Sequence, residues 1–211
     1  MAYRPTQKTM ARKAEIRQRI LDAALTVVSS GGFGALTMLA VASRADIATG
    51  AVYKHFESKA SLCAEVFRLA TEKEVAVVRE NALGPGTPSQ RLQRAVHAFA
   101  LRALRNPRLA FALIAEPVDA LVDVQRLHFR QAYADTFVAL VEQGIASGEF
   151  APQLPSVSAA ALVGVIAESL VGPLSWPTSD RPSTDNDALI AAIQAFCLRA
   201  VSAIPAIRPR P

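Results

Sequence analysis

Apolar residues recur at helical spacing along most of the chain, and no stretch alternates apolar and polar residues as a strand would. A first helix is predicted over residues 12–30, where the apolar positions share one face and Gly31-Gly32 ends the pattern. Further helices are predicted from Ser58 to about Asn81, over residues 91–105, after Asn106-Pro107, and over residues 118–147, 156–171 and 185–204. The pattern predicts an all-α fold.

Residues 37–59 carry two short helical patterns separated by a tight turn. Thr37 precedes the first pattern as an N-cap, and the turn follows at Ala45-Asp46-Ile47. In the second pattern Val52 and Phe56 should point inward, and the outward positions are Thr49, Ala51, Lys54 and His55. Two short helices around a tight turn predict a helix-turn-helix, which places its second helix in the major groove of DNA.

The positive charge of the chain is confined to its N-terminal part. Residues 1–59 hold nine of the 23 Lys and Arg residues and four of the 18 Asp and Glu residues, which accounts for the whole net charge of +5. The rest of the chain is neutral. A basic excess on the proposed helix-turn-helix favours contact with nucleic acid, and the alternative is a solvated basic face.

Residues 12–62 resemble the tetracycline-repressor (TetR) family. The matching positions are Thr37, Val41-Ala42, Ala45, Gly50, Val52-Tyr53, His55-Phe56, Lys59 and Leu62. Three residues depart from the family pattern: Asp46 replaces the usual turn glycine, Ala48 a capping serine, and Ala51 a common threonine. Asp tolerates the left-handed conformation, so the turn should survive, but the two alanines reduce the hydrogen bonding available to bases.

The resemblance implies an N-terminal DNA-binding domain, residues 1–59, that binds a palindromic operator in double-stranded DNA. We expect its contacts to come from Thr37, Arg44, Thr49, Gly50, Ala51, Tyr53, Lys54, His55 and Lys59. Lys59 opposes the helix dipole in the first turn of its helix, which favours a role at a phosphate. His55 could instead cover the small core. Residues 1–11, with Arg4 and Lys8, should be a disordered arm, either idle or reaching the DNA.

The remaining residues, 60–211, are expected to form a larger helical domain for effector binding and dimerisation. By resemblance to the family, this domain would bind a small, so far unidentified, effector that releases the DNA. The candidate effector-binding residues are Phe99, Phe111, His128, Tyr133 and Trp176, and Trp176 follows a helix end at Gly172-Pro173. The alternative for each aromatic residue is that it only fills the core.

The last two predicted helices present small apolar residues on nearly all sides. Such helices must be buried on two faces, and a partner subunit supplies the second face most simply. The candidate dimerisation residues are Ala160, Gly164, Ala167, Ala192, Phe196 and Ala200. The alternative is a core helix of a monomer. Thr184 and Asp187 suggest a capping box at the start of the last helix.

Other classes of protein fit the sequence less well. Residues 157–174 are apolar enough to suggest a membrane span, but Glu168 near the centre and Gly172-Pro173 favour a buried helix. Cys63 and Cys197 suit neither a metal site nor a disulfide framework, and a reducing cytoplasm is the simplest location. We found no catalytic spacing and expect no cofactor.

We therefore predict a homodimeric transcriptional regulator, a repressor. The alternatives are an effector-independent or architectural DNA-binding protein and, with less support, a helical enzyme.

Overall fold

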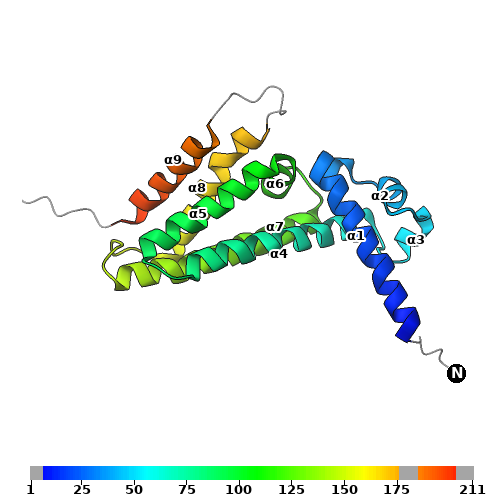
Figure 1. Cartoon of the computed structure of the whole chain (residues 1–211), viewed down its shortest axis with the longest axis horizontal. Coiled ribbons are helices and arrows are strands. Elements are labelled where there is room, and N and C mark those ends of the chain that lie inside the picture. Colours follow the sequence, from blue (N-terminus) through cyan, green and yellow to red (C-terminus); the bar gives the residue numbers. More distant parts are fainter. Residues whose placement is uncertain (1–6, 176–184, 203–211) are drawn as a thin grey trace, which may run out of the picture.

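The computed structural model describes residues 7–175 and 185–202, and within them every regular element is a helix (Figure 1). Along the chain these are α1 (Gln7–Ala35), α2 (Met38–Ala45), α3 (Thr49–Tyr53), α4 (Lys59–Leu83), α5 (Pro88–Arg105), α6 (Pro107–Ile114), α7 (Ala120–Ala146), α8 (Pro155–Ser175) and α9 (Asn186–Val201). Helices α1–α3 form a small head at one end, and the others form an elongated bundle. The all-α prediction is confirmed.

The helix-turn-helix is formed by α2, α3 and the turn between them. The Thr37 hydroxyl caps α2 by accepting the Ala40 N–H at 3.0 Å. Asp46 takes the left-handed conformation, with φ 51°, and Arg19 of α1 donates to the Ala45 carbonyl beside it. The turn that a glycine would normally form is therefore held by an aspartate and by a cation from the preceding helix.

The head packs around an apolar core in which Val52 and Phe56 are buried, as the sequence predicted. Ile20, Leu36, Val41 and Val52 are completely inaccessible to solvent, and Phe33 and Phe56 close the ends of the cluster. The same cluster continues into the bundle through Leu62 and Phe67 of α4, Ala112 of α6, and Val122 and Phe129 of α7. Packing therefore crosses the predicted domain boundary at residue 59, and that boundary stays a prediction.

Helix α4 is the covalent connection between the head and the bundle. Its start is fixed by reciprocal hydrogen bonds, in which the Ser58 hydroxyl accepts the Ser61 N–H and the Ser61 hydroxyl accepts the Ser58 N–H. This is a capping box with serine in place of the usual acid. Lys59 consequently occupies the first helical position, as the sequence predicted.

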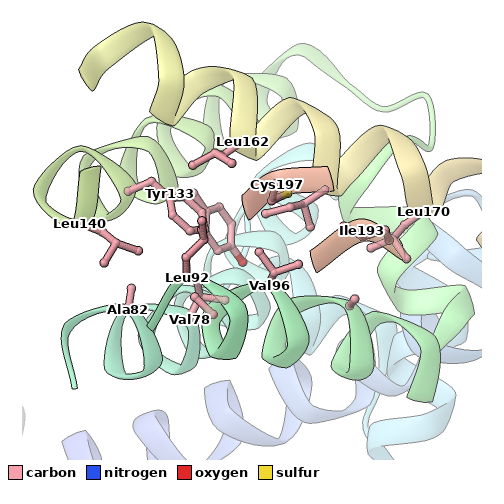
Figure 2. Close-up of a cluster of buried hydrophobic side chains, with 14 of the residues drawn as sticks. Val78, Ala82, Leu92, Val96, Tyr133, Leu140, Leu162, Leu170, Ile193 and Cys197 are labelled. Atoms are coloured by element: carbon pink, nitrogen blue, oxygen red, sulfur yellow. The ribbon is translucent and has the colours of Figure 1, made fainter. Parts of the chain in front are cut away.

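The bundle has a second core, made where α4, α5, α7, α8 and α9 face one another. Figure 2 shows this cluster, in which Leu92, Leu140, Leu162, Leu170 and Ile193 are at most 4% exposed. Each such side chain contributes about 1.5–3 kcal/mol relative to an exposed position. The apolar composition of α8 is explained by the burial of its leucines inside the bundle.

Helix α1 begins earlier than the sequence predicted. Residues 7–11 are helical and exposed, whereas we expected them to be disordered. They lack apolar periodicity because nothing covers them, but Gln, Lys, Met and Ala are good helix formers. At the other end the predicted break is confirmed, because Gly32 leaves the helical conformation with φ 76°.

The ends of α8 and α9 also differ from the prediction. Helix α8 continues through Gly172-Pro173 to Ser175, because a proline in the last turn removes only one hydrogen bond and the following Leu174 is buried. Helix α9 is capped by Asp185, whose carboxylate accepts the Asp187 N–H at 2.9 Å, so the proposed capping box is wrong. Helix α9 ends at Val201, and the predicted positions Thr184 and Ile204 lie outside the described residues.

Candidate DNA-binding face and ligand cavity

The candidate DNA-binding face is made of predicted residues that are exposed on α2, beside α3 and at the start of α4. Arg44 at the end of α2, Lys54 just after α3 and Lys59 at the start of α4 are all exposed. Tyr53 is 53% exposed, although a tyrosine normally buries its ring. Thr37 lies at the edge of this face, with its hydroxyl already engaged as the α2 cap. Three cations and a phenol of the helix-turn-helix region are therefore accessible to a partner.

Helix α3 itself presents an open surface of small residues. A Cβ built on Gly50 would meet nothing within 4 Å, so intramolecular packing does not require glycine there. Ala48 provides no side-chain cap for α3, and Thr49 and Ala51 are half-buried. Thr49 is therefore the one side chain from 48 to 51 that can form a hydrogen bond with a base.

His55 lies differently from the prediction that it faces outward. It is half-buried, and its Nδ1 is enclosed with no hydrogen-bond partner among the described residues. Burial lowers the pKa of His55, and the neighbouring cations Lys13 and Arg17 lower it further. An imidazole held neutral beside two cations favours a role in packing of the head over a direct charge on the DNA.

Two basic residues that were not predicted in the site, Arg12 and Lys13, lie on the same exposed helical turns as Lys8 of the predicted arm. Lys8, Arg12 and Lys13 are exposed on the first turns of α1, which extend beyond the head in Figure 1. Their signal was present, because Lys8 and Arg12 are four residues apart and so share a helical face. Arg4, the other residue of the predicted arm, lies outside the described residues.

A cavity of about 300 Å³ lies in the bundle, between α4, α5, α6, α7 and α8. Its wall is largely apolar, and two of the predicted effector residues, Phe99 and Tyr133, line it with their rings 5.3 Å apart in an edge-to-face contact. Burial raises the pKa of Tyr133 well above its usual range, and Glu74 adds to the shift. The phenol is therefore neutral, and the inner part of the cavity suits apolar groups.

Arginines from α5 and α7 gather at the polar part of the cavity wall. Arg102 is held by Glu74 through two hydrogen bonds of 2.5 and 2.8 Å, which raise the pKa of Arg102. Arg105 and Arg130 are exposed, and neither forms an ion pair with any described residue. The charge of Arg130 also lowers the pKa of Arg126, which is mainly lowered by burial. An anion would relieve this concentration of positive charge.

The other predicted effector residues lie elsewhere. Phe111 of α6 lies beneath the Arg108 guanidinium, and His128 is exposed beside Phe129. Neither lines the cavity, and Trp176 lies outside the described residues. Phe129 and the arginines do line it and were missed. Arginines three or four residues apart on α5 and on α7 were the available signal.

A shallow apolar groove lies between α8 and α9 on the outer side of the bundle. Gly164, Ala192 and Phe196 line it as the sequence predicted, and Phe196 is 51% exposed. Ala160 and Ala200 are exposed, whereas Ala167 lines the inner cavity instead. Figure 1 shows α8 and α9 together at one edge of the bundle. The predicted dimer residues therefore share one exposed face, except Ala167.

Two alternative kinds of site have little support from the described residues. Helix α8 is the single described helix long and apolar enough to span a membrane, a test that core helices of soluble proteins also pass. Its inner face, with Leu162, Ile166 and Leu170, is buried against the bundle. Within residues 7–175 and 185–202, no three His, Cys, Asp or Glu side chains gather closely enough to hold a metal ion.

Two protein-family models match the chain, in the two parts where these sites lie. Residues 20–66 match the model described as bacterial regulatory proteins, tetR family, and residues 85–170 match the tetracyclin repressor-like C-terminal domain. The first match covers the helix-turn-helix, and the second covers most of the cavity wall. Together they account for more than half of the chain.

Several curated relatives are named as transcriptional regulators. The repressor KstR of Mycolicibacterium smegmatis is 42% identical over 99 residues, which are 47% of this chain and 48% of that protein. The chain thus spans about half the length of the KstR relatives that it matches. The activator FasR of the same organism is 27% identical over 197 residues, covering 92% of this chain and 86% of that protein.

Solved structures of regulators share the fold of the whole chain. FadR of Bacillus subtilis, crystallised in complex with stearoyl-CoA, superposes with a TM-score of 0.73 at 19% identity. The superposition covers 87% of this chain and 98% of FadR. A regulator of Rhodococcus RHA1 gives a TM-score of 0.68 at 23% identity, with 90% and 98% covered. At these identities the likeness concerns the fold.

Proposed function

Because the chain belongs to the tetR family of bacterial regulatory proteins, we propose that it is a DNA-binding transcriptional repressor that a small molecule releases from its operator. The observation that carries the proposal is the open face of α3, flanked by the exposed cations Arg44, Lys54 and Lys59. The named regulators among its relatives support it. Such a regulator acts where the DNA is, in the bacterial cytoplasm, and two free buried thiols suit that reducing compartment.

Binding to DNA would depend more on phosphates than on bases. Ala48 and Ala51 offer no side-chain hydrogen bond, so base recognition falls to Thr49, Lys54 and Arg44, and to the Ala51 methyl against a thymine. We assign backbone contacts to Lys59, Tyr53 and Thr37, and also to Lys8, Arg12 and Lys13 on the start of α1, because all six are exposed. Phosphate contacts fix the position of the protein without reading sequence.

Lys59→Ala and Thr49→Ala should therefore have different effects on DNA binding. Lys59→Ala should weaken binding to cognate and scrambled duplexes by similar factors and reduce the salt slope by about one unit per lost contact in each subunit. Thr49→Ala should lower the ratio of cognate to scrambled affinity and leave the slope nearly unchanged. Salt titrations on an operator selected from random duplexes test both. Loss of cognate binding alone in Lys59→Ala would contradict the phosphate role.

The proposed oligomer is a homodimer through the exposed face of α8 and α9. A palindromic operator needs two helix-turn-helix units related by a two-fold axis, and a self-complementary face supplies that axis. The face is apolar, with Val157 and Phe196 more than half exposed, and Gly164 leaves room for a close approach of helices. Exposed apolar area of this kind indicates a protein partner.

Gly164→Arg should produce a monomer that no longer binds a two-half-site operator. The substitution would place a long, charged side chain where two helices are proposed to approach closely, in a groove that Glu168 also lines, so it should crowd the interface and separate the subunits. Sedimentation equilibrium and operator binding are the measurements, and Glu142→Arg, an equally exposed position on α7, is the control. An intact dimer of the Gly164 variant would remove this interface.

The proposed effector is an amphipathic anion, an acyl thioester of coenzyme A. The inner wall formed by Val78, Phe99 and Val163 suits an acyl chain, and the unpaired Arg105 and Arg130 suit phosphates. The FadR structure that shares this fold contains stearoyl-CoA, which supports the class. A volume of about 300 Å³ lies at the small end of ligand pockets, which favours a chain shorter than stearoyl.

Dodecanoyl-CoA should stabilise the protein and weaken its binding to the operator. At a ligand concentration about a hundred times the dissociation constant, the free energy of unfolding should rise by about 2.7 kcal/mol. Calorimetric titration should show weaker binding by the double variant Arg105→Ala, Arg130→Ala, and unchanged binding by Arg79→Ala on α4. If neither dodecanoyl-CoA nor a panel of apolar and aromatic compounds changes stability or operator affinity, the effector-independent alternative is correct.

A further inference from the structure

The break in α1 at Gly32 leaves two backbone donors in need of a partner. Gly32 has φ 76°, and a Cβ at this position would overlap the Arg108 guanidinium and the Glu116 carboxylate. The chain turns here and begins a last short helical turn at Phe33 and Gly34. The N–H groups at the start of a helical turn have no partner within the helix, and burying them unpaired is costly.

Glu116 supplies that partner from the other part of the chain. Glu116 is 8% exposed, and its carboxylate accepts the Phe33 N–H at 3.1 Å and the Gly34 N–H at 3.0 Å. Arg108 lies 3.5 Å from the same carboxylate and also donates to the Gly31 carbonyl at 2.6 Å. A residue of the bundle thus holds the end of α1 from 83 and 82 positions away in sequence.

The segment that carries Glu116 is also part of the cavity wall. Helix α6, which ends two residues earlier, lines the cavity with Leu109, Ala110, Leu113 and Ile114. Arg126 of α7 lines it as well and donates to the carbonyls of Ala112, Leu113 and Glu116 at 3.3, 3.1 and 2.7 Å. A molecule in the cavity therefore contacts the helix and the cation that fix the position of Glu116.

We infer that Glu116 is the residue through which occupancy of the cavity reaches the helix-turn-helix. A molecule that fills the cavity displaces α6 against Arg126, the Glu116 carboxylate moves with it, and its hydrogen bonds to Phe33 and Gly34 shift or break. The end of α1 leads directly into the Thr37 cap of α2, so the DNA-binding face changes position. This inference rests on the proposed function, and Glu116 is a positioning residue that touches neither ligand nor DNA.

A double-mutant cycle between the cavity and Glu116 tests the inference without any ligand. Val163→Phe adds a ring to the cavity from α8, a helix that packs on α6. It should weaken operator binding at least about fivefold, the lower end of typical allosteric coupling. In a Glu116→Gln background, which removes the charged double acceptor but keeps the size, the same substitution should change operator affinity less than about twofold. Residues without shared partners otherwise have additive effects.

Two further variants act as controls for this cycle. Glu142→Gln removes an exposed carboxylate of α7 and should leave the full effect of Val163→Phe in place. Ala167→Leu fills the cavity from the same helix with a smaller side chain and should repeat the pattern if the phenylalanine variant folds poorly.

The outcomes separate the inference from the proposed effector class. If Val163→Phe weakens operator binding equally in the wild-type and in the Glu116→Gln background, or if neither cavity-filling variant affects it, the coupling role is wrong. If the cycle behaves as expected but dodecanoyl-CoA does not release the operator, the coupling role stands and the acyl thioester is the wrong ligand. Dodecanoyl-CoA that releases wild type and Glu116→Gln equally well overturns the inference and leaves the proposed function intact.

Discussion

The structure depends on satisfying the backbone where α1 breaks. A helix break inside a protein leaves backbone donors without a helical partner, and a buried donor such as the Phe33 N–H costs about 1–3 kcal/mol if it stays unsatisfied. At Gly32 the chain bends because only a residue without a Cβ fits between Arg108 and Glu116, and the freed N–H groups pair with the buried Glu116 carboxylate. The head and the bundle are consequently joined by hydrogen bonds as well as by α4.

This connection explains how the head can change when the bundle changes. Its own core, centred on Val41 and Val52, is closed by side chains of the bundle, including Ala112 and Phe129. A head that is completed by another part of the chain cannot remain unaffected when that part moves. The free-energy difference between two such arrangements need be only a few kcal/mol for a ligand to change their populations.

Away from the DNA-binding face, arginines form the ion pairs and many of the hydrogen bonds that connect the helices. Arg17 packs over Phe56 at 5.0 Å and pairs with Glu65, whose pKa falls to about 2, mainly because Arg68 also binds it. Arg126 holds the end of α6, and Arg102 is neutralised by Glu74. Among the described residues, Arg105 and Arg130 of the cavity wall form no ion pair, and the same holds for Arg79 and Arg199 elsewhere on the surface.

Features set by local sequence were predictable. Thr37 caps α2 as expected, and the helices predicted to begin at Ser58 and after Asn106 do so, with these two residues as their caps. The inward positions Val52 and Phe56 are buried as predicted. The exposed face of α8 and α9 followed from the same reasoning, because small apolar residues on both sides of a helix require two partners.

Features that depend on how the helices are arranged in space were not predicted. Phe111 and Tyr133 look alike in sequence, but the rotation of α6 and α7 turns one away from the cavity and the other into it. Residues 7–11 carry no apolar period, so the sequence pattern did not predict that they are helical. Glu116 pairs with backbone groups 83 and 82 residues away, and sequence spacing holds no signal of such a contact.

The most direct test of the account measures hydrogen exchange at the Phe33 and Gly34 amides, without DNA, in the free protein and in protein saturated with dodecanoyl-CoA. Their protection depends on the Glu116 carboxylate, so the ligand should speed exchange at these two amides and leave core amides such as Val41 unchanged. If dodecanoyl-CoA weakens operator binding while both amides exchange at their original rates, the link between the cavity and the head runs elsewhere and the account is contradicted.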